Sequence, residues 1–290
     1  MDLHNCTVCP RRCGADRYKA PGRCGSDAVM RIARIAPHMW EEPCLSGTQG
    51  AGTVFFTGCS LRCVYCQNHD ISRGDIRGRG YSPRELADEL LRLRDKGVHN
   101  IDFVTPTHFV PLIMDTLDLC RSELGIPVVY NSSGYERTET VEALRGYIDI
   151  YLPDVKYFSP QLSKELSAAE DYFSYAYAAV KAMTLQVGRP VFDKDGIMQK
   201  GVIVRHMILP SHRRDSEEVL RHLAEMKDDI LLSLMRQYTP FYKAAEHHGL
   251  DRKLSTYEYE KVLAAAQDIG FDGFMQERSS ATSAFTPDFS

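Results

Sequence analysis

Short apolar runs alternate with amphipathic helical patterns from about residue 52 onward. The runs are rich in β-branched and aromatic residues, which is typical of buried strands. They predict six strands, at 52–57, 101–105, 127–131, 148–153, 201–209 and 230–238. Helical patterns lie at 83–96, 111–124, 138–147, 160–187, 215–228 and 256–269. Strands that alternate with helices pair in parallel, and right-handed crossovers curl the sheet. We therefore expect an α/β fold whose sheet forms a barrel or part of one.

The first 50 residues show little of this pattern. They are poor in apolar residues and carry five cysteines among proline, glycine and arginine, namely Cys6, Cys9, Cys13, Cys24 and Cys44. Such a segment has no evident core of its own, and a bound metal or cluster would supply the missing folding energy. We therefore expect two parts, a cysteine-rich segment over residues 1–50 and a barrel over residues 51–290.

The composition is that of an ordinary soluble globular protein, with 43% hydrophobic and 26% charged residues. A net charge of -4 argues against a generally nucleic-acid-binding surface, although it leaves room for a local basic patch. No apolar run is long enough to span a bilayer, and the residues after Met1 lack the pattern of a secretion signal. We expect a cytoplasmic protein without a membrane partner.

The cysteines are unevenly distributed, because eight of the nine lie at or before Cys66. Tight C-x2-C spacings in a chain without a secretion signal indicate metal or cluster ligands rather than disulfides. The ninth cysteine, Cys120, lies on an apolar helical face and is expected to be a core residue.

The most specific chemical signal is the run Cys59, Cys63 and Cys66, a C-x3-C-x2-C spacing directly after a predicted strand. Three thiolates on one loop can hold three irons of a four-iron cluster, which normally takes four cysteines. The fourth iron is then open to bind a small molecule. The alternative is a structural zinc site with a distant fourth ligand.

Polar residues also follow the other predicted strands. In a parallel α/β barrel the chemistry lies at the C-terminal ends of the strands, so we expect these side chains to meet at one rim. They are Thr105, Thr107, His108, Asn131, Ser132, Ser133, Asp154, Lys156, Arg205, His206, Gln237 and Tyr238.

These features together resemble the radical S-adenosylmethionine (SAM) superfamily, whose signature has the form C-x3-C-x-Tyr-C found at 59–66. Within it, the chain resembles relatives of the pyruvate formate-lyase activating enzyme. The motifs that carry this closer resemblance are Glu41–Cys44, Val104–Phe109, Tyr151–Tyr157, Arg205–His206 and Ser233–Tyr238. The resemblance implies a partial (β/α)6 barrel of the TIM type and a [4Fe-4S] cluster whose open iron chelates SAM. It further implies that one electron cleaves SAM to a 5'-deoxyadenosyl radical, which abstracts a hydrogen atom.

The resemblance also assigns roles to individual residues. Cys59, Cys63 and Cys66 are the expected cluster ligands, and Tyr65 is expected near the adenine. Thr105 and Thr107 stand where related enzymes have a Gly-Gly-Glu stretch that receives the methionine amino group, so only backbone carbonyls can serve here. The remaining expected cofactor contacts are Asn131 at an acidic position of the activating enzyme, Asp154 and Lys156 in its Asp-x-Lys motif, and Arg205 with His206 in its Arg-His pair.

The N-terminal cysteines leave two interpretations open. Cys6, Cys9, Cys13 and Cys24 form a C-x2-C-x3-C-x10-C set, which suits a closed zinc site or a second iron–sulfur cluster. Cys44 either replaces one of them or is a small core residue.

We thus expect a radical SAM oxidoreductase of the activating-enzyme type, which forms a glycyl radical on a partner enzyme. An electron donor such as flavodoxin or ferredoxin is also implied. The alternative is radical modification of a small molecule, a peptide or a tRNA. A hypothesis of another class is a non-catalytic metal-binding interaction module. The basic, glycine-rich loop at 73–80 is either a solvated loop or a contact for an anionic partner.

Overall fold

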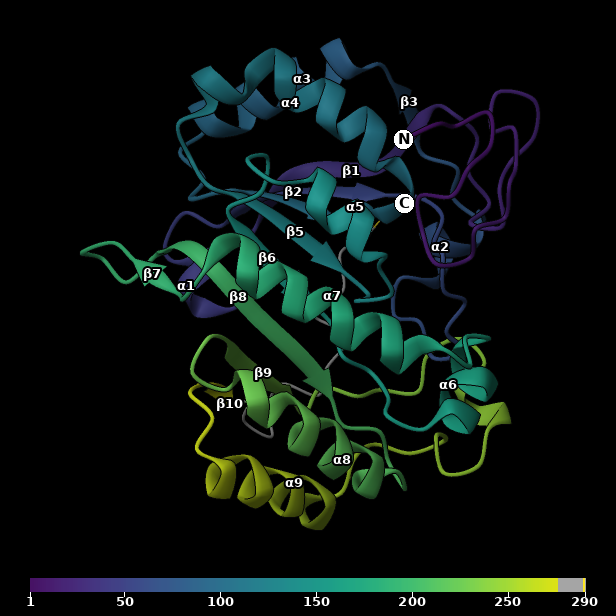
Figure 1. The fold of residues 1–290 in the computed structure, drawn as a ribbon, viewed down its shortest axis with the longest axis vertical. Coiled ribbons are helices and arrows are strands. Elements are labelled where there is room, and N and C mark those ends of the chain that lie inside the picture. Colours follow the sequence, from purple (N-terminus) through teal and green to yellow (C-terminus); the bar gives the residue numbers. More distant parts are fainter. Residues whose placement is uncertain (276–288, 290) are drawn as a thin grey trace.

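The computed structural model describes residues 1–275 and residue 289. Within them, parallel strands form the centre of one sheet (Figure 1). In spatial order these are β2 (Ala51–Phe56), β4 (Ile101–Val104), β5 (Val128–Ser132), β6 (Ile150–Pro153), β8 (Met198–Met207) and β9 (Leu231–Met235). A short parallel strand, β10 (Gly273–Met275), extends the sheet beyond β9. At the other edge β1 (Met30–His38) pairs antiparallel with β2 and with β3 (Arg79–Tyr81).

Helices connect the parallel strands and cover the outer face of the curved sheet (Figure 1). The main ones are α3 (Pro83–Asp95), α4 (Val110–Leu124), α5 (Thr138–Ala143), α7 (Tyr172–Val187), α8 (Arg213–Leu223) and α9 (Thr256–Ile269). The other helices are α1 (Pro43–Ser46), α2 (His69–Arg73) and α6 (Pro160–Ser167). In the described residues the edge strands β3 and β10 do not pair with each other, so the barrel is incomplete. The predicted α/β partial barrel is confirmed.

Local sequence signals explain several boundaries. The Ser82 hydroxyl accepts a hydrogen bond from the Glu85 N–H, and the Glu85 carboxylate accepts one from the Ser82 N–H, which forms a capping box at the start of α3. Leu86, Leu90 and Leu93 then recur on one face of the helix, and all three are buried. The start and packing of α3 therefore follow directly from its sequence.

Two expectations need correction. The helical pattern at 160–187 is two helices, α6 and α7, because Ala168 adopts a left-handed conformation with φ 51°. The Arg11 guanidinium donates to the carbonyls of Ser167 and Ala168 at this break. The helical pattern of residues 160–187 could not reveal this contact, because Arg11 lies far away in the sequence. The first 50 residues are also more ordered than expected, because residues 30–38 form β1 within the main sheet.

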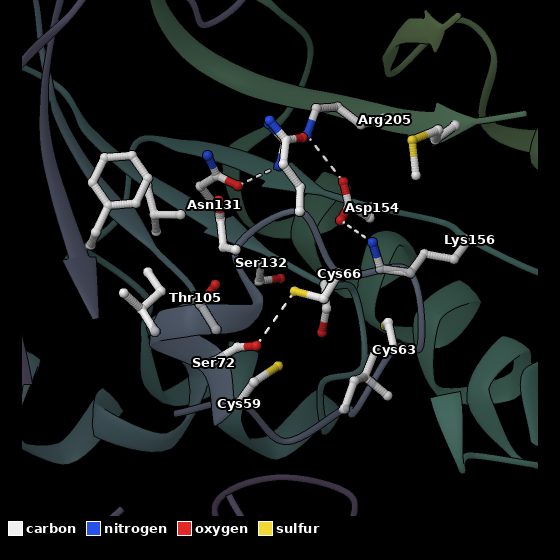
Figure 2. Close-up of a pocket in the computed structure, with 18 of the residues that line it drawn as sticks. Cys59, Cys63, Cys66, Ser72, Thr105, Asn131, Ser132, Asp154, Lys156 and Arg205 are labelled. Atoms are coloured by element: carbon white, nitrogen blue, oxygen red, sulfur yellow. Dashed lines mark hydrogen bonds and ion pairs between the residues drawn. The ribbon is translucent and has the colours of Figure 1, made fainter. Parts of the chain in front are cut away.

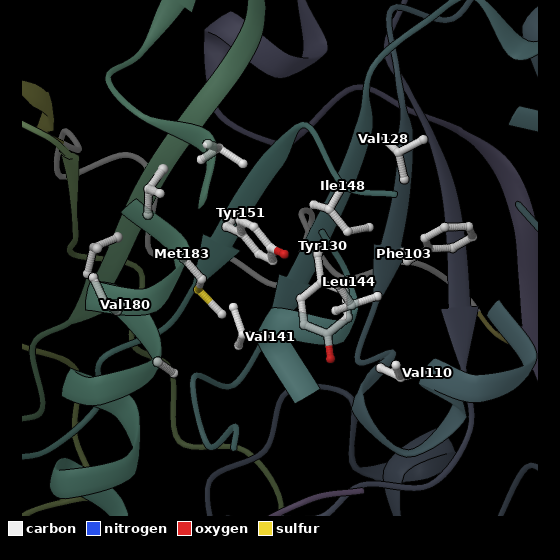
Figure 3. Packing of buried hydrophobic residues seen from close by; sticks show 14 of the residues in the cluster. Phe103, Val110, Val128, Tyr130, Val141, Leu144, Ile148, Tyr151, Val180 and Met183 are labelled. Atoms are coloured by element: carbon white, nitrogen blue, oxygen red, sulfur yellow. The ribbon is translucent and has the colours of Figure 1, made fainter. Parts of the chain in front are cut away.

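The core has an outer and an inner layer. In the outer layer Phe103, Tyr130 and Tyr151 point from the strands toward residues of the covering helices such as Val141 and Met183 (Figure 3). The inner cluster fills the barrel with strand residues that face the opposite way, together with Cys44 and Leu45 of α1. It comprises Cys44, Leu45, Val129, Ile150, Leu152, Met198, Ile203 and Leu231. Cys44 is therefore a core residue of the barrel. None of the described helices is long and apolar enough to cross a membrane.

Candidate active site

A cavity of about 230 Å³ lies at the C-terminal ends of the parallel strands (Figure 2). Most of the polar residues that the sequence places at strand ends line it. These are Cys59, Cys63, Cys66, Thr105, Asn131, Ser132, Ser133, Asp154, Lys156, Arg205 and Gln237, and Tyr65 joins them from the cysteine loop. Parallel pairing brings these positions together, because the parallel strands β2, β4, β5, β6, β8 and β9 all end at the same rim.

The cysteine loop leaves β2 through a sharp turn at Gly58, which has φ 84°. A Cβ at this position would lie 2.3 Å from the Ser26 Oγ and 2.9 Å from the Cys24 carbonyl oxygen. Glycine is thus required both for the backbone conformation and for the close approach of the N-terminal segment. The loop that follows presents Cys59, Cys63 and Cys66 to the cavity.

Hydroxyl groups lie against two of the three sulfurs. The Ser167 Oγ donates to the Cys63 Sγ at 2.9 Å, and the Ser72 Oγ lies 3.4 Å from the Cys66 Sγ. Burial raises the pKa of the Cys59 and Cys66 thiols. They are therefore neutral without a metal and must lose protons to become ligands.

Charged residues of neighbouring strands form a buried network beside the thiols (Figure 2). The Arg205 Nε donates to the Asp154 Oδ1 at 3.1 Å, and one terminal nitrogen donates to the Asn131 Oδ1 at 2.5 Å. The Lys156 Nζ donates to the other oxygen of Asp154 at 2.5 Å. Although burial opposes ionisation, the two cations lower the pKa of Asp154, and Asp154 in turn raises the pKa of Lys156. All three side chains are charged.

Two acidic residues belong to the same network, and sequence reasoning gave them no role. The Glu41 carboxylate accepts from Arg205 at 3.3 Å and lines the cavity. Asp102 lies beneath it and accepts from Asn131 at 3.2 Å. Burial and their mutual repulsion raise the pKa of Glu41, and burial raises that of Asp102, so this carboxyl pair retains a proton. The signal that the sequence offered for Glu41 was its place in the motif Glu41–Cys44, whereas Asp102 showed only as a polar residue within a predicted strand.

Thr105 occupies an unusual backbone conformation at the end of β4, with φ 59°. A β-branched residue in this left-handed region is an outlier, and such strain concentrates at functional sites. Its N–H donates to the Asn131 carbonyl at 2.9 Å, which fixes the turn at the cavity wall.

Two expected cofactor contacts are not among the cavity-lining residues. The Thr107 hydroxyl donates to the Glu136 carboxyl at 2.5 Å. The His206 Nδ1 lies 2.6 Å from the Val155 carbonyl oxygen, and burial lowers the pKa of this imidazole, which keeps it neutral. Successive residues of a strand face opposite sides, so Arg205 faces the cavity and His206 does not.

Comparison with known proteins now decides the family. The sequence profile of the radical SAM superfamily matches residues 53–186, which include the three loop cysteines, Asp154 and Lys156. The chain belongs to the radical SAM superfamily.

This radical SAM protein has relatives along most of its length. It is 31% identical over 277 residues to an uncharacterized protein of Methanocaldococcus jannaschii, a match that covers 92% of this chain and 76% of the other. It is 28% identical to the pyruvate formate-lyase-activating enzyme of Clostridium pasteurianum, over 79% of this chain and 92% of that enzyme. Among solved structures, Streptococcus suis SuiB bound to S-adenosylmethionine has a TM-score of 0.46 at 16% identity. That match covers 76% of this chain and only 45% of SuiB.

Membership of the superfamily implies a [4Fe-4S] cluster and SAM binding, and the cysteine loop fits both. Its three thiols face one cavity, one accepts from the Ser167 hydroxyl, another lies against the Ser72 hydroxyl, and cations stand beside them. Because the superfamily binds a [4Fe-4S] cluster, its match to this loop favours the cluster over the zinc alternative.

Proposed function

We propose that this protein is an activating-enzyme-type radical SAM oxidoreductase, which forms a glycyl radical on a partner enzyme. The observation that carries the radical chemistry is the loop of three cysteines facing the Asp154, Lys156 and Arg205 network across one cavity. Support for the activating type comes from the pyruvate formate-lyase-activating enzymes of Clostridium pasteurianum and Staphylococcus aureus, which align over 79% and 81% of this chain.

Each part of the site has a distinct task in this proposal. Cys59, Cys63 and Cys66 hold the cluster. When bound, the cluster supplies the electron that cleaves SAM and releases the 5'-deoxyadenosyl radical. Lys156 pairs with the methionine carboxylate, and Arg205 holds the ribose side of SAM.

The buried network prepares the site for its ligand. Asp154 is held between Lys156 and Arg205, so both cations are oriented before SAM arrives. The backbone of Thr105 offers a carbonyl to the methionine amino group. Apolar walls that include Phe55 and Val104 help to exclude water, which protects a radical from side reactions.

The first test is reductive cleavage of SAM by the anaerobically reconstituted protein with dithionite. We expect 5'-deoxyadenosine and methionine from the wild type and none from Cys63→Ala. The matched control is Cys120→Ala, which removes a buried thiol of α4 far from the loop in sequence and retains activity. If both variants keep their activity, the assignment of the cluster loop is wrong.

The second test addresses the activating role. The reconstituted protein is mixed with a glycyl-radical enzyme and SAM, and we expect the electron paramagnetic resonance (EPR) doublet of a glycyl radical. If 5'-deoxyadenosine accumulates without a glycyl radical, while a small molecule, peptide or tRNA stimulates its formation, the activating role is wrong. The radical SAM chemistry then stands with another substrate.

A further inference from the structure

The N-terminal segment brings four thiols together without a helix or strand of its own, because residues 1–29 form only turns and loops. The Cys6 N–H donates to the Ala15 carbonyl at 3.1 Å, which folds the segment back on itself. The sulfurs of Cys13 and Cys24 lie 3.4 and 3.6 Å from the point where a Gly22 Cβ would stand. The Gly14 N–H donates to the Cys6 carbonyl at 3.0 Å and the Arg12 N–H donates to the Cys9 carbonyl at 3.1 Å, so these turns place Cys6 and Cys9 beside the residues that flank Cys13.

The same segment holds a buried cation. Arg17 is 1% exposed, and its guanidinium donates to three backbone carbonyls, those of Ser26, Asp27 and His108. No carboxylate of the described residues forms an ion pair with it. An uncompensated buried charge is costly, and the Ser26 carbonyl that accepts from Arg17 lies two residues after Cys24. A centre of net negative charge bound by these cysteines would balance Arg17.

This segment contacts the radical-site loop directly. The Cys59 N–H donates to the Cys24 carbonyl at 3.1 Å, so one hydrogen bond joins a ligand of each set. The Arg62 guanidinium donates to the Arg23 carbonyl at 2.9 Å. At the opposite end Cys13 is exposed, and the exposed Arg12 and Arg23 give its surroundings a positive charge.

We propose that Cys6, Cys9, Cys13 and Cys24 hold a second, fully cysteine-ligated iron–sulfur cluster that delivers electrons to the radical site. A low-potential electron-transfer protein with an acidic surface gives up one electron near Cys13 and is oxidised. The second cluster is reduced and then reoxidised as the electron passes by way of Cys24 and Cys59. The electron is consumed when the carbon–sulfur bond of SAM breaks into methionine and the 5'-deoxyadenosyl radical. The delivery step rests on the proposed function, whereas the second cluster does not.

The first experiment isolates the second site. The full chain carrying Cys59→Ala, Cys63→Ala and Cys66→Ala is reconstituted anaerobically with ferrous iron and sulfide. We expect about four irons and four sulfides per chain, with an EPR signal on reduction that SAM does not alter. Further replacement of Cys9 and Cys24 by alanine removes this iron, whereas Cys120→Ala does not. Binding of zinc in preference to iron and sulfide, or of neither, would overturn the proposal. Since the triple variant has no radical site, its result is independent of SAM chemistry.

The second experiment tests delivery. In Cys9→Ala, the rate of the first turnover with reduced flavodoxin should fall by at least an order of magnitude. The yield per radical-site cluster after photoreduction should be unchanged, which shows that the radical site is intact. Arg23→Glu keeps all four thiols and should slow reduction by flavodoxin in a salt-dependent manner. Equal rates in the wild type and both variants would show that electrons reach the radical site by another route.

Discussion

The hydroxyl of Tyr65 lies 2.6 Å from the hydroxyl of Tyr157, and both side chains are buried. The chain of hydrogen bonds continues from Tyr157 to the Ser167 Oγ at 2.7 Å and from there to the Cys63 Sγ at 2.9 Å. The aromatic residue of the cysteine loop is thus tied through α6 to a sulfur of the same loop. Its place near the adenine of SAM stays a prediction.

Ser167→Ala should lower the reduction potential of the radical-site cluster. The Ser167 hydroxyl donates a hydrogen bond to the Cys63 sulfur. Such a bond stabilises the reduced cluster more than the oxidised one, because the reduced cluster carries more negative charge. If reduction strengthens that bond by about 1 kcal/mol, its loss shifts the potential by about 40 mV. Redox titration followed by EPR measures the shift. Ser163→Ala is the control, because among the described residues that buried hydroxyl of α6 bonds only the Pro160 carbonyl. An equal shift in both variants would contradict the role of the bond to Cys63.

Gly134→Ala should destabilise the fold severely. Gly134 has φ 74°, and a Cβ there would lie 2.0 Å from the Asp154 carbonyl oxygen. We expect a loss of roughly 3 kcal/mol or more, since strain and overlap both contribute. Gly146→Ala is the matched control, because its φ is 85° and no atom lies within 4 Å of its Cβ position. It should cost only about 1 to 2 kcal/mol. Anaerobic urea unfolding compares the two, and similar losses would show that contact with β6 is unimportant.

Arg205→Gln should cost about 3 kcal/mol of stability and abolish SAM binding. The change leaves Asp154 with Lys156 alone and removes the cation beside Glu41, and breaking a buried ionic network is strongly unfavourable. Unfolding and equilibrium dialysis with SAM measure the two effects. Arg121→Gln breaks a 2.6 Å pair with Asp149 in which both side chains are 29% exposed. It should cost about 1 kcal/mol or less and leave SAM binding intact. A stable Arg205→Gln variant that binds SAM normally would contradict the network's role.

Glu136→Gln should make stability less dependent on pH. Burial raises the pKa of Glu136 from 4.5 to about 7, so between these values the folded state holds a proton that the unfolded state releases. Stability therefore falls as pH rises through this window, and above it the cost is on the order of 3 kcal/mol. Glutamine does not ionise, so it removes the cost of burying a carboxylate. The Glu136→Gln variant should therefore be more stable than the wild type at about pH 8.

The control for this prediction is Glu139→Gln in α5. Hydrogen bonds from its own N–H and from Arg137 lower the pKa of Glu139. The contribution of this carboxylate to the stability of the fold is therefore present above pH 4.5 and is lost only on acidification. Its replacement should leave the slope between about pH 5 and 7 unchanged. If the free energy of unfolding changes equally with pH in the wild type and in Glu136→Gln, Glu136 is ionised over the whole window from about pH 5 to 7.

Much of the site followed from the sequence because its signals are local. The strands are apolar runs, the cysteine loop follows one of them, and parallel pairing brings the strand ends together. Which side chain faces the cavity could not be predicted, because a shift of one residue turns a strand side chain to the other face. Arg205 and His206 illustrate this, since the sequence gave no reason to separate them.

Contacts between distant segments were also beyond the sequence. Glu41 meets Arg205 from 164 residues away, and Arg11 ends α6 from 156 residues away. Strand β1, which lies between β2 and β3, was missed because only Met30 and Ile32 are buried in a run that otherwise contains arginine, proline and histidine. Such features depend on tertiary partners rather than on local periodicity.

The order in which the chain is made has a consequence for iron loading. The cysteine loop at 59–66 is synthesised early, but Tyr157, Ser167 and Arg205, which support it or face it, come far later. A nascent chain that ends before them exposes the thiols on an unsupported turn, open to oxidation. We therefore expect the radical-site cluster to assemble only after the chain has been synthesised beyond Arg205.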